Sequence, residues 1–425
     1  MRRLSSGPAD DWDRRTGFVG LDWAKNHHDV VAVDRDGRIA MELRIDDDAK
    51  GWRRLRERLI EWVGADLSVV AATIETCFGP AVERLLEFGC AVYPISPKAA
   101  QSYRDRKAPS GVKDDLLDAW SLADGLRTDG HGWRRLVPDD PMTQHLRMLC
   151  RDEKGLIEQR TALVNQLQDA LHEYYPAALA AFDDWTMPAA WAFIERFPTP
   201  QKLAKAGRRR WEKFLHTHRL YRPQTYEKRL GIFAAATSFC GNEPVTAAKS
   251  MLAVALARQL RGLEARLTEY RRQIESLYAQ HVDSGIFDSL PGMGPKLGPR
   301  ILSEMGDRRE RFPDAESLQC YAGPAPVSFQ SGQIKRVVFR RACNKHLRHA
   351  VHLWVDESRQ RCVWAQTYYQ KKREEGKSHA CALRCLGQRW LKILWKMWQT
   401  RTPYDEAYHT RNQVRHGSWV VQLSA

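Results

Sequence analysis

The sequence predicts an N-terminal α/β domain followed by an all-α remainder. Between residues 17 and 130, short apolar runs bounded by turn residues alternate with amphipathic helical patterns. Beyond residue 140, apolar residues recur at helical spacing over two long stretches. The chain has 425 residues, of which 43% are hydrophobic, so it is long enough for two or three domains with cores of their own.

The expected N-terminal domain spans residues 17–130 and begins with a three-stranded meander. After the meander, helices and strands alternate, an order that is typical of layered α/β domains. The predicted strands are 17–23, 28–34, 38–45, 67–75 and 90–96, and the predicted helices are 46–64, 79–89, 98–106 and 113–127.

A helical connector is expected over residues 143–281. Two long amphipathic helices, 143–177 and 247–281, flank an insert at 178–250 to which the sequence assigns no role. Leucines at heptad-like spacing favour an antiparallel coiled-coil arm, and an ordinary helical bundle fits the same pattern. The remaining predicted parts are a compact C-terminal domain at 286–402 and a tail without a strong pattern at 403–425.

The charge distribution indicates a polyanionic partner. The formal net charge is +15 and the pI is about 9.5. Residues 17–130 carry a net charge of −4, whereas residues 286–425 carry +12. This asymmetry fits an acidic catalytic centre joined to a nucleic-acid grip, and a basic protein with solvated faces has the same composition.

The sequence contains no signal for a membrane or for secretion. No window of about 18 apolar residues predicts a transmembrane helix, and the N-terminus lacks the apolar stretch of a secretory signal. Nine cysteines occur without a C-x-x-C pair, which indicates reduced thiols and a cytoplasmic location.

Four acidic residues form the first candidate site. Asp22 closes the first predicted strand, Glu75 closes the fourth, and Asp115 and Asp118 share one helix face. Asp114 is expected to point about 100° away from Asp115 on the same helix. Crowded carboxylates repel one another unless a cation neutralises them, and hard oxygen ligands suit Mg²⁺ or Mn²⁺. Two such ions can stabilise both oxygens in phosphodiester chemistry.

The segment 290–307 predicts a tight turn that leads into a helix. In LPGMGPKLGPRILSEMGD, the glycine amides at Gly292 and Gly294, together with Lys296, could contact a phosphate of the nucleic-acid backbone. A purely structural turn fits the same residues.

A Gly/Pro-rich loop at 321–332 places Ser331 beside Gly332. A nucleophilic serine needs an exposed hydroxyl, a small neighbour and cations for the phosphate. Ser328 is a second candidate in the same loop, and a turn serine beside a basic DNA-contact helix fits the pattern as well. The cations that follow within 17 residues are Lys335, Arg336, Arg340, Arg341, Lys345 and Arg348.

These motifs together resemble the DEDD transposases of insertion-sequence family one-ten. The first block comprises the aspartate in FVGLDWAKNHHDV, the glutamate in TIETCFGP, and a K-x-D-x-x-D-A pattern at Lys113, Asp115, Asp118 and Ala119. The C-terminal block, which contains LPGMGPKLGPRILSEMGD, YAGPAPVSFQSGQ and CNKHLRHA, resembles the second transposase domain of that family.

The resemblance implies a RuvC/RNase H-like N-terminal domain, a coiled-coil connector and a small helical C-terminal transposase domain. It also implies a recombinase that is guided by a structured non-coding RNA, the bridge RNA, which pairs with donor and target DNA. The quartet Asp22, Glu75, Asp115 and Asp118 would hold Mg²⁺, and Ser331 would form a covalent phosphoserine link. The family combines the acidic domain of one subunit with the serine domain of another, in homodimers that assemble into homotetramers, and a nucleoid-associated bacterial protein is expected.

Two other functions fit the residues. In the first, a RuvC-like structure-specific endonuclease cuts DNA with metal and water, and the serine loop is only structural. In the second, the chain binds nucleic acid without catalysis. A covalent protein–DNA adduct separates the recombinase from the endonuclease, and cleavage that a chelator abolishes would exclude the pure binding protein.

Overall fold

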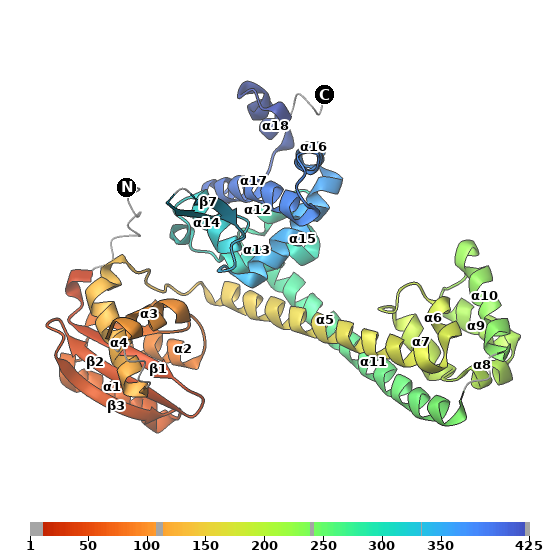
Figure 1. Ribbon diagram of the computed structural model, residues 1–425, viewed down its shortest axis with the longest axis horizontal. Coiled ribbons are helices and arrows are strands. Elements are labelled where there is room, and N and C mark those ends of the chain that lie inside the picture. Colours follow the sequence, from red (N-terminus) through yellow and green to blue (C-terminus); the bar gives the residue numbers. More distant parts are fainter. Residues whose placement is uncertain (1–11, 108–113, 239–241, 333, 421–425) are drawn as a thin grey trace. The chain divides into compact units, whose positions relative to one another are not determined.

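The computed structural model describes residues 12–107, 114–238, 242–332 and 334–420, and it contains two compact units (Figure 1). The first unit is Met1–Pro138 and the second is Asp139–Ala425. The first is mixed α/β and the second is mostly helical, as the sequence predicts. Among the described residues, no helix is long and apolar enough to cross a membrane.

The N-terminal unit is built on a five-stranded sheet in the order β3-β2-β1-β4-β5. The first three strands form the predicted antiparallel meander, and β4 and β5 add to β1 in parallel. Strand β4 is shorter than predicted because a 3₁₀ turn, Leu67–Val69, precedes it. The strands are β1 (Gly17–Trp23), β2 (His27–Asp34), β3 (Ile39–Asp46), β4 (Val70–Ile74) and β5 (Ala91–Pro94).

Helices cover both faces of this sheet. Helices α1 (Ala49–Val63) and α2 (Pro80–Glu87) pack on one face, where residues such as Val19 and Leu55 share a core. Helix α4 (Asp115–Asp129) packs on the other face, and α3 (Pro97–Lys107) lies beside it.

Gly20 allows α4 to lie directly on β1. A Cβ added at Gly20 would lie 1.9 Å from the Ala119 carbonyl oxygen and 2.6 Å from the Ala123 amide nitrogen. No side chain fits in that space, so only glycine permits this approach. The close packing fixes where the first turn of α4 lies along β1.

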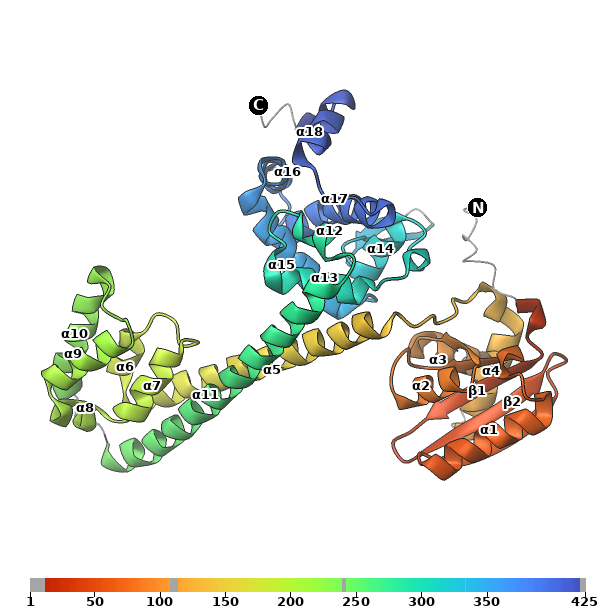
Figure 2. The same ribbon diagram turned by 180° about the vertical axis from the view of Figure 1, so that it is seen from behind.

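In the C-terminal unit, α5 (Pro141–Tyr174) and α11 (Glu243–Gln280) form an antiparallel pair (Figure 2). Leucines pack at both ends of the pair, but its middle is polar. There the buried Glu153 lies 3.3 Å from Arg271 and 2.7 Å from Arg300, and Arg160 lies 2.8 Å from Glu264. Ion pairs therefore interrupt the leucine seam that the heptad-like spacing predicts.

The insert between these two helices is helical and has its own aromatic core. Trp211 stacks on Phe214 at 5.6 Å, and Phe193 lies 5.2 Å from Trp211. The core also includes Leu167 and Leu256, so the ends of α5 and α11 belong to it. The helices of the insert are α6 (Pro176–Ala181), α7 (Pro188–Arg196), α8 (Pro200–Ala206), α9 (Arg208–Thr217) and α10 (Pro223–Ser238).

The C-terminal part packs on the other end of the α5–α11 pair in one continuous core. Ile274 and Tyr278 of α11 share this core with Trp354, so no break in packing separates residues 281 and 286. Its helices are α12 (Ser284–Asp288), α13 (Gly294–Met305), α14 (Ala315–Ala322), α15 (Lys345–Arg361), α16 (Val363–Glu374), α17 (His379–Thr400) and α18 (Glu406–Arg415).

One expectation about this part was wrong. Residues 327–338 form a two-stranded hairpin, β6 (Val327–Ser331) and β7 (Ile334–Val338), in place of an irregular loop. The segment after residue 403, to which the sequence assigns no structure, packs on the domain: Tyr404 accepts a hydrogen bond from the Trp364 indole at 3.0 Å, and Trp419 stacks on Tyr368.

Candidate active site

Asp22 and Glu75 stand at the same edge of the sheet because their strands are parallel neighbours. Both residues come one position beyond the last pair of the β1–β4 ladder. Alternate side chains of a strand face opposite sides of the sheet. Phe18 and Ala71 belong to the core under α4, and each acid lies four residues further along its strand. Both carboxylates are therefore directed toward the α4 side.

Helix α4 contributes Asp115 and Asp118 in its first turn. Side chains three residues apart share a helix face, and the contact at Gly20 brings that turn close to β1. Asp114 does not lie within the helix as expected. It is the N-cap, and its carboxylate accepts a hydrogen bond from the Leu116 amide at 3.0 Å.

These four residues, which we call the carboxylate quartet, interact electrostatically. Burial and the charges of Asp118, Glu75 and Asp115 raise the pKa of Asp22 to about 6. Burial also raises the pKa of Glu75, and the charge of Asp118 adds to this effect, while Arg104 lowers it. Asp22 therefore lies within electrostatic range of the other three predicted acids, although the four come from three separate elements.

Two residues on neighbouring strands, Asp29 and Arg44, lie beside the quartet and are not predicted from the sequence. Asp29 of β2 is the cross-strand partner of Asp22, and Arg44 of β3 is the partner of Asp29. The Arg44 guanidinium donates to both carboxylate oxygens of Asp29 at 2.8 Å and lies 3.3 Å from Oδ2 of Asp115. Ligand atoms of His27, Asp29 and Asp115 lie within 4.8 Å of one another.

A second arginine reaches the quartet from α3. Arg104 forms an ion pair with the buried carboxylate of Asp118. Arg44 and Arg104 thus compensate part of the acidic charge on Asp115 and Asp118, while burial and the remaining acidic charge keep the pKa of Asp22 raised.

The donor set fits a hard divalent cation. Carboxylate oxygens are the ligands that Mg²⁺ and Mn²⁺ prefer, and the nearby imidazole of His27 is a further donor suited to Mn²⁺. A bound cation would remove the repulsion that raises the pKa of Asp22. The arrangement can therefore hold a metal ion at the edge of the sheet.

Ser331 is the last residue of β6 and is exposed at the turn of the hairpin. Gly332 begins the turn with φ of 54°, in the left-handed region that favours glycine. The turn thus explains why glycine follows Ser331, and the Ser331 side chain is exposed to solvent.

Ser331 and Ser328 face opposite sides of the hairpin because they are three residues apart. Phe329 lies on the same side as Ser331, and its cross-strand partner Arg336 stacks on it with the guanidinium 5.0 Å from the ring centroid. Directly paired side chains point to the same side of an antiparallel ribbon. Ser331 therefore shares its face with a cation held in place.

The other residues predicted to contact nucleic acid have different surroundings. A Cβ at Gly292 would lie 2.7 Å from the Ser358 amide nitrogen, so this glycine serves the packing of the turn on α15. Arg340 donates to the Ala325 carbonyl at 3.1 Å and so holds the loop before the hairpin. Gly294, Lys296, Arg341 and Lys345 are exposed, and Arg348 lines a pocket. Lys113 and the side chain of Lys335 lie outside the described residues.

Two transposase families match separate parts of the chain. A DEDD family described as "Transposase" matches residues 19–176. A second family, described as "Transposase IS116/IS110/IS902 family", matches residues 284–370. The first match covers the sheet with its quartet, and the second covers the serine hairpin.

Relatives match along almost the whole chain. "Mini-circle putative transposase for IS117" of Streptomyces coelicolor is 37% identical over 402 residues, which cover 93% of this chain and 96% of the relative. "Insertion element IS116 uncharacterized 44.8 kDa protein" of Streptomyces clavuligerus is 29% identical, with coverage of 92% and 96%. "Insertion element IS110 uncharacterized 43.6 kDa protein" of Streptomyces coelicolor is 27% identical, with coverage of 91% and 95%.

The α/β unit with its acidic cluster and these matches define the class of the protein as a transposase, an enzyme that recombines DNA. Within that class, the chain belongs to the IS110 family of insertion-sequence transposases, the family one-ten that its motifs resemble.

Proposed function

We propose that this transposase is an RNA-guided recombinase that cuts and exchanges DNA strands with the carboxylate quartet and Ser331. The observation that carries the proposal is the set of four carboxylates from β1, β4 and α4, where burial of Asp22 and the charges of the other three acids raise its pKa to about 6. A sheet of three antiparallel and two parallel strands with helices on both faces supports a RuvC/RNase H-like fold for this unit.

In this function Asp22, Glu75, Asp115 and Asp118 hold Mg²⁺ or Mn²⁺. The cation supplies charge stabilisation for the oxygens of a phosphodiester under attack. Arg44 and Arg104 hold the carboxylates of Asp115 and Asp118 in place through the ion pairs described above. They act as positioning residues, because each reaches the quartet through a carboxylate.

Ser331 is the proposed nucleophile. Its Oγ attacks the phosphorus of a DNA phosphodiester, an Oγ–P bond forms, one backbone P–O bond breaks, and the proton of the serine hydroxyl passes to the departing DNA oxygen. The phosphoserine link keeps a phosphodiester bond at the cut end, so a DNA hydroxyl from the exchanged strand can reverse the step and release Ser331 without an external energy source. Arg336 on the same face offers positive charge to the phosphate.

The resemblance supports the partners of this reaction. They are a structured bridge RNA, donor DNA and target DNA, handled by homodimers that pair into a homotetramer in which the quartet of one subunit serves the serine of another. The net charge of +12 over residues 286–425 favours binding of such polyanions.

Trapping of the covalent intermediate tests this function. The protein is purified from cells that carry its flanking DNA, co-purified RNA is sequenced, and the complex is incubated with end-labelled DNA and Mg²⁺. After denaturation, we expect one discrete RNA and label that stays on the wild-type protein and on Ser328→Ala but not on Ser331→Ala.

The water-using nuclease gives a different result in the same experiment. Cut DNA without label on the protein would assign hydrolysis to the quartet and leave the hairpin a structural role. Cleavage that persists in excess EDTA would exclude the metal from either mechanism.

A further inference from the structure

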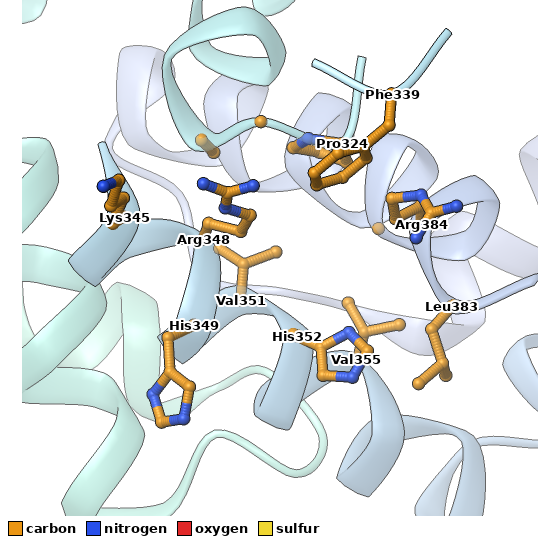
Figure 3. A pocket seen from close by; sticks show the side chains of 13 residues that line it. Pro324, Phe339, Lys345, Arg348, His349, Val351, His352, Val355, Leu383 and Arg384 are labelled. Atoms are coloured by element: carbon orange, nitrogen blue, oxygen red, sulfur yellow. The ribbon is translucent and has the colours of Figure 1, made fainter. Parts of the chain in front are cut away.

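The C-terminal unit contains a pocket of about 270 Å³ that the proposed reaction does not use (Figure 3). Its apolar floor consists of buried side chains from α15 and α17, among them Val351, Val355 and Leu383. Gly387 of α17 leaves one wall open, because a Cβ there would meet its nearest neighbour, Val355, only at 3.5 Å. The volume lies just below the ~300–1,000 Å³ of drug-sized sites, so the pocket suits one flat ring system.

The mouth of the pocket is positively charged. Lys345, Arg348 and Arg384 line it, and no acidic side chain does. Among the described residues, none of these three cations has an ion-pair partner within 4.0 Å. Most other buried or half-buried arginines of this unit are paired, for example Arg309 with Asp283. Three such cations around one apolar pocket indicate an anionic ligand that brings its own apolar part.

An aromatic ring stands between two of these cations. The guanidinium groups of Arg348 and Arg384 lie 5.1 Å and 4.9 Å from the ring centroid of Phe339, and Figure 3 shows Phe339 between the two side chains. The ring is 44% exposed although it is large and apolar. The ring thus holds two guanidinium groups in place, and the planes of these groups are surfaces on which a nucleobase can stack.

The pocket also lies close to the hairpin along the chain. Phe339 follows β7 directly and stands five positions after Ile334, which lies at the turn. At ~3.3 Å per residue, that separation is roughly 17 Å. When a nucleic-acid strand binds at Ser331, a nucleotide only a few steps further along that strand can therefore reach the pocket.

We infer that this pocket binds one unstacked nucleotide of a nucleic-acid strand, with its base on the apolar floor beside Phe339 and its phosphate on Arg348, Arg384 and Lys345. The inference rests on the proposed function, because that function provides the unpaired strands. They come from DNA opened at the exchange site or from the guide RNA. Both sources share the same chemistry, a base with a phosphate. A pocket of this kind would hold a nucleotide out of the stack while the neighbouring phosphate reacts.

The test uses the full-length Ser331→Ala protein in EDTA, so that binding is measured without chemistry. The probes are a single-stranded DNA decamer with one central 2-aminopurine, the RNA decamer of the same sequence, and free AMP. We expect an enhanced 2-aminopurine signal on binding, because the unstacked base is no longer quenched. Arg384→Gln should weaken binding of the decamer about tenfold, and Gly387→Leu should fill the pocket and abolish the signal.

Two matched controls accompany these variants. Arg389→Gln removes an exposed arginine from the same helix outside the pocket, and Gly387→Ala adds a methyl group that fits in ordinary contact. Both should bind the decamer within twofold of the parent protein. Thermal melting of each variant shows whether α17 is intact, and Arg384→Gln keeps the test valid should Gly387→Leu fail to fold.

The outcomes separate this inference from the proposed function. A stronger signal with DNA assigns the pocket to the opened duplex, and a stronger signal with RNA assigns it to the guide. Unchanged binding and signal in Arg384→Gln and Gly387→Leu would overturn the inference, as would AMP binding as tightly as the decamers. None of these results depends on whether Ser331 forms an adduct.

Discussion

The acidic site of the N-terminal unit and the serine hairpin of the C-terminal unit are built in opposite ways. The quartet is assembled from two strands and a helix, and burial together with neighbouring acidic charge raises the pKa of Asp22 and Glu75. The hairpin is one local ribbon, exposed on both faces, whose nucleophile needs only a turn glycine and a neighbouring cation. A site that concentrates repelling charges needs a rigid scaffold, whereas a nucleophile that must reach DNA needs exposure.

The largest effects are expected from substitutions that remove a carboxylate of the quartet or the Ser331 hydroxyl. Asp22→Ala, Glu75→Ala, Asp115→Ala, Asp118→Ala and Ser331→Ala should each reduce strand exchange below detection, because loss of a nucleophile or a metal ligand removes many kcal/mol of transition-state stabilisation. Binding of nucleic acid, measured by filter retention, should persist, since that affinity is spread over many Lys and Arg side chains. Strand exchange by Ser331→Ala would refute the assignment of the nucleophile.

The scaffold of the quartet can be broken without touching a carboxylate. Gly20→Ala places a methyl group 1.9 Å from the Ala119 carbonyl, so α4 must move away from β1. We expect a loss of about 1–3 kcal/mol in the free energy of unfolding and loss of strand exchange. Gly132→Ala, whose Cβ would meet nothing within 4 Å, is the matched control. Wild-type activity in Gly20→Ala would show that the position of α4 is not critical.

The burial of the Asp22 carboxylate and the repulsion from its acidic neighbours should also be measurable as a stability effect. The pKa of Asp22 is about 6 in the folded state against 3.8 ordinarily. Above pH 6 the carboxylate is ionised in both states, and the penalty is fully present. As the pH falls from 6 toward 4, the folded state binds the proton first, and the penalty disappears.

Asp22→Asn should therefore melt at a higher temperature than the wild type at pH 7.5 in EDTA. We expect a gain of about 1–2 kcal/mol in the free energy of unfolding after allowance for solvent screening. The difference should shrink at pH 5, and Mg²⁺ should raise the melting temperature of the wild type more than that of the variant. An Asp22→Asn protein that is less stable than the wild type at pH 7.5 would contradict the account.

Arg44→Gln should have a smaller effect on the same site. Its loss leaves the Asp29 carboxylate, which is only 4% exposed, without its bidentate partner. We expect a lower melting temperature in EDTA, and we expect Mn²⁺ to restore much of the loss by taking the place of the missing charge. Arg38→Gln, which removes an exposed pair with Asp36, serves as the control and should be neutral.

The smallest effect is expected in the hairpin itself. Ser328→Ala alters the face opposite Ser331, so strand exchange should stay within a few-fold of the wild type. Arg336→Gln removes the cation on the Ser331 face and should reduce the rate of adduct formation about tenfold, as loss of one charged contact to a phosphate does. Equal effects of the two substitutions would contradict the assignment of faces.

These two sites also differ in how far the sequence predicts them. Asp22 and Glu75 could be found because apolar strands end in an acid, and Asp115 and Asp118 because they share a helix face. The roles of Asp29 and Arg44 could not be predicted, because they depend on the strand register. Only the position of the turn after β1 shows that Asp22 pairs with Asp29 and Asp29 with Arg44. Arg104 reaches Asp118 through tertiary packing, for which no sequence pattern exists.

The hairpin was missed because both of its faces are exposed. A strand is recognised by alternation of apolar and polar residues, and the described side chains of β6 and β7 show no buried face that would impose it. The leucine spacing of the long helices predicted their pairing but not the buried Glu153 with its two arginines, since such ion pairs replace apolar contacts at positions that still face the partner.

The covalent bond between the protein and DNA can be located directly. Wild-type protein is incubated with guide RNA, DNA and Mg²⁺, denatured and digested with nuclease and trypsin, and the peptides are sequenced by mass spectrometry. The account predicts a nucleotide on Ser331 in the peptide that spans residues 312–335, present with Mg²⁺ and absent with EDTA or after Asp22→Asn. Cleaved DNA with no modified peptide, or a nucleotide on Ser328, would contradict it.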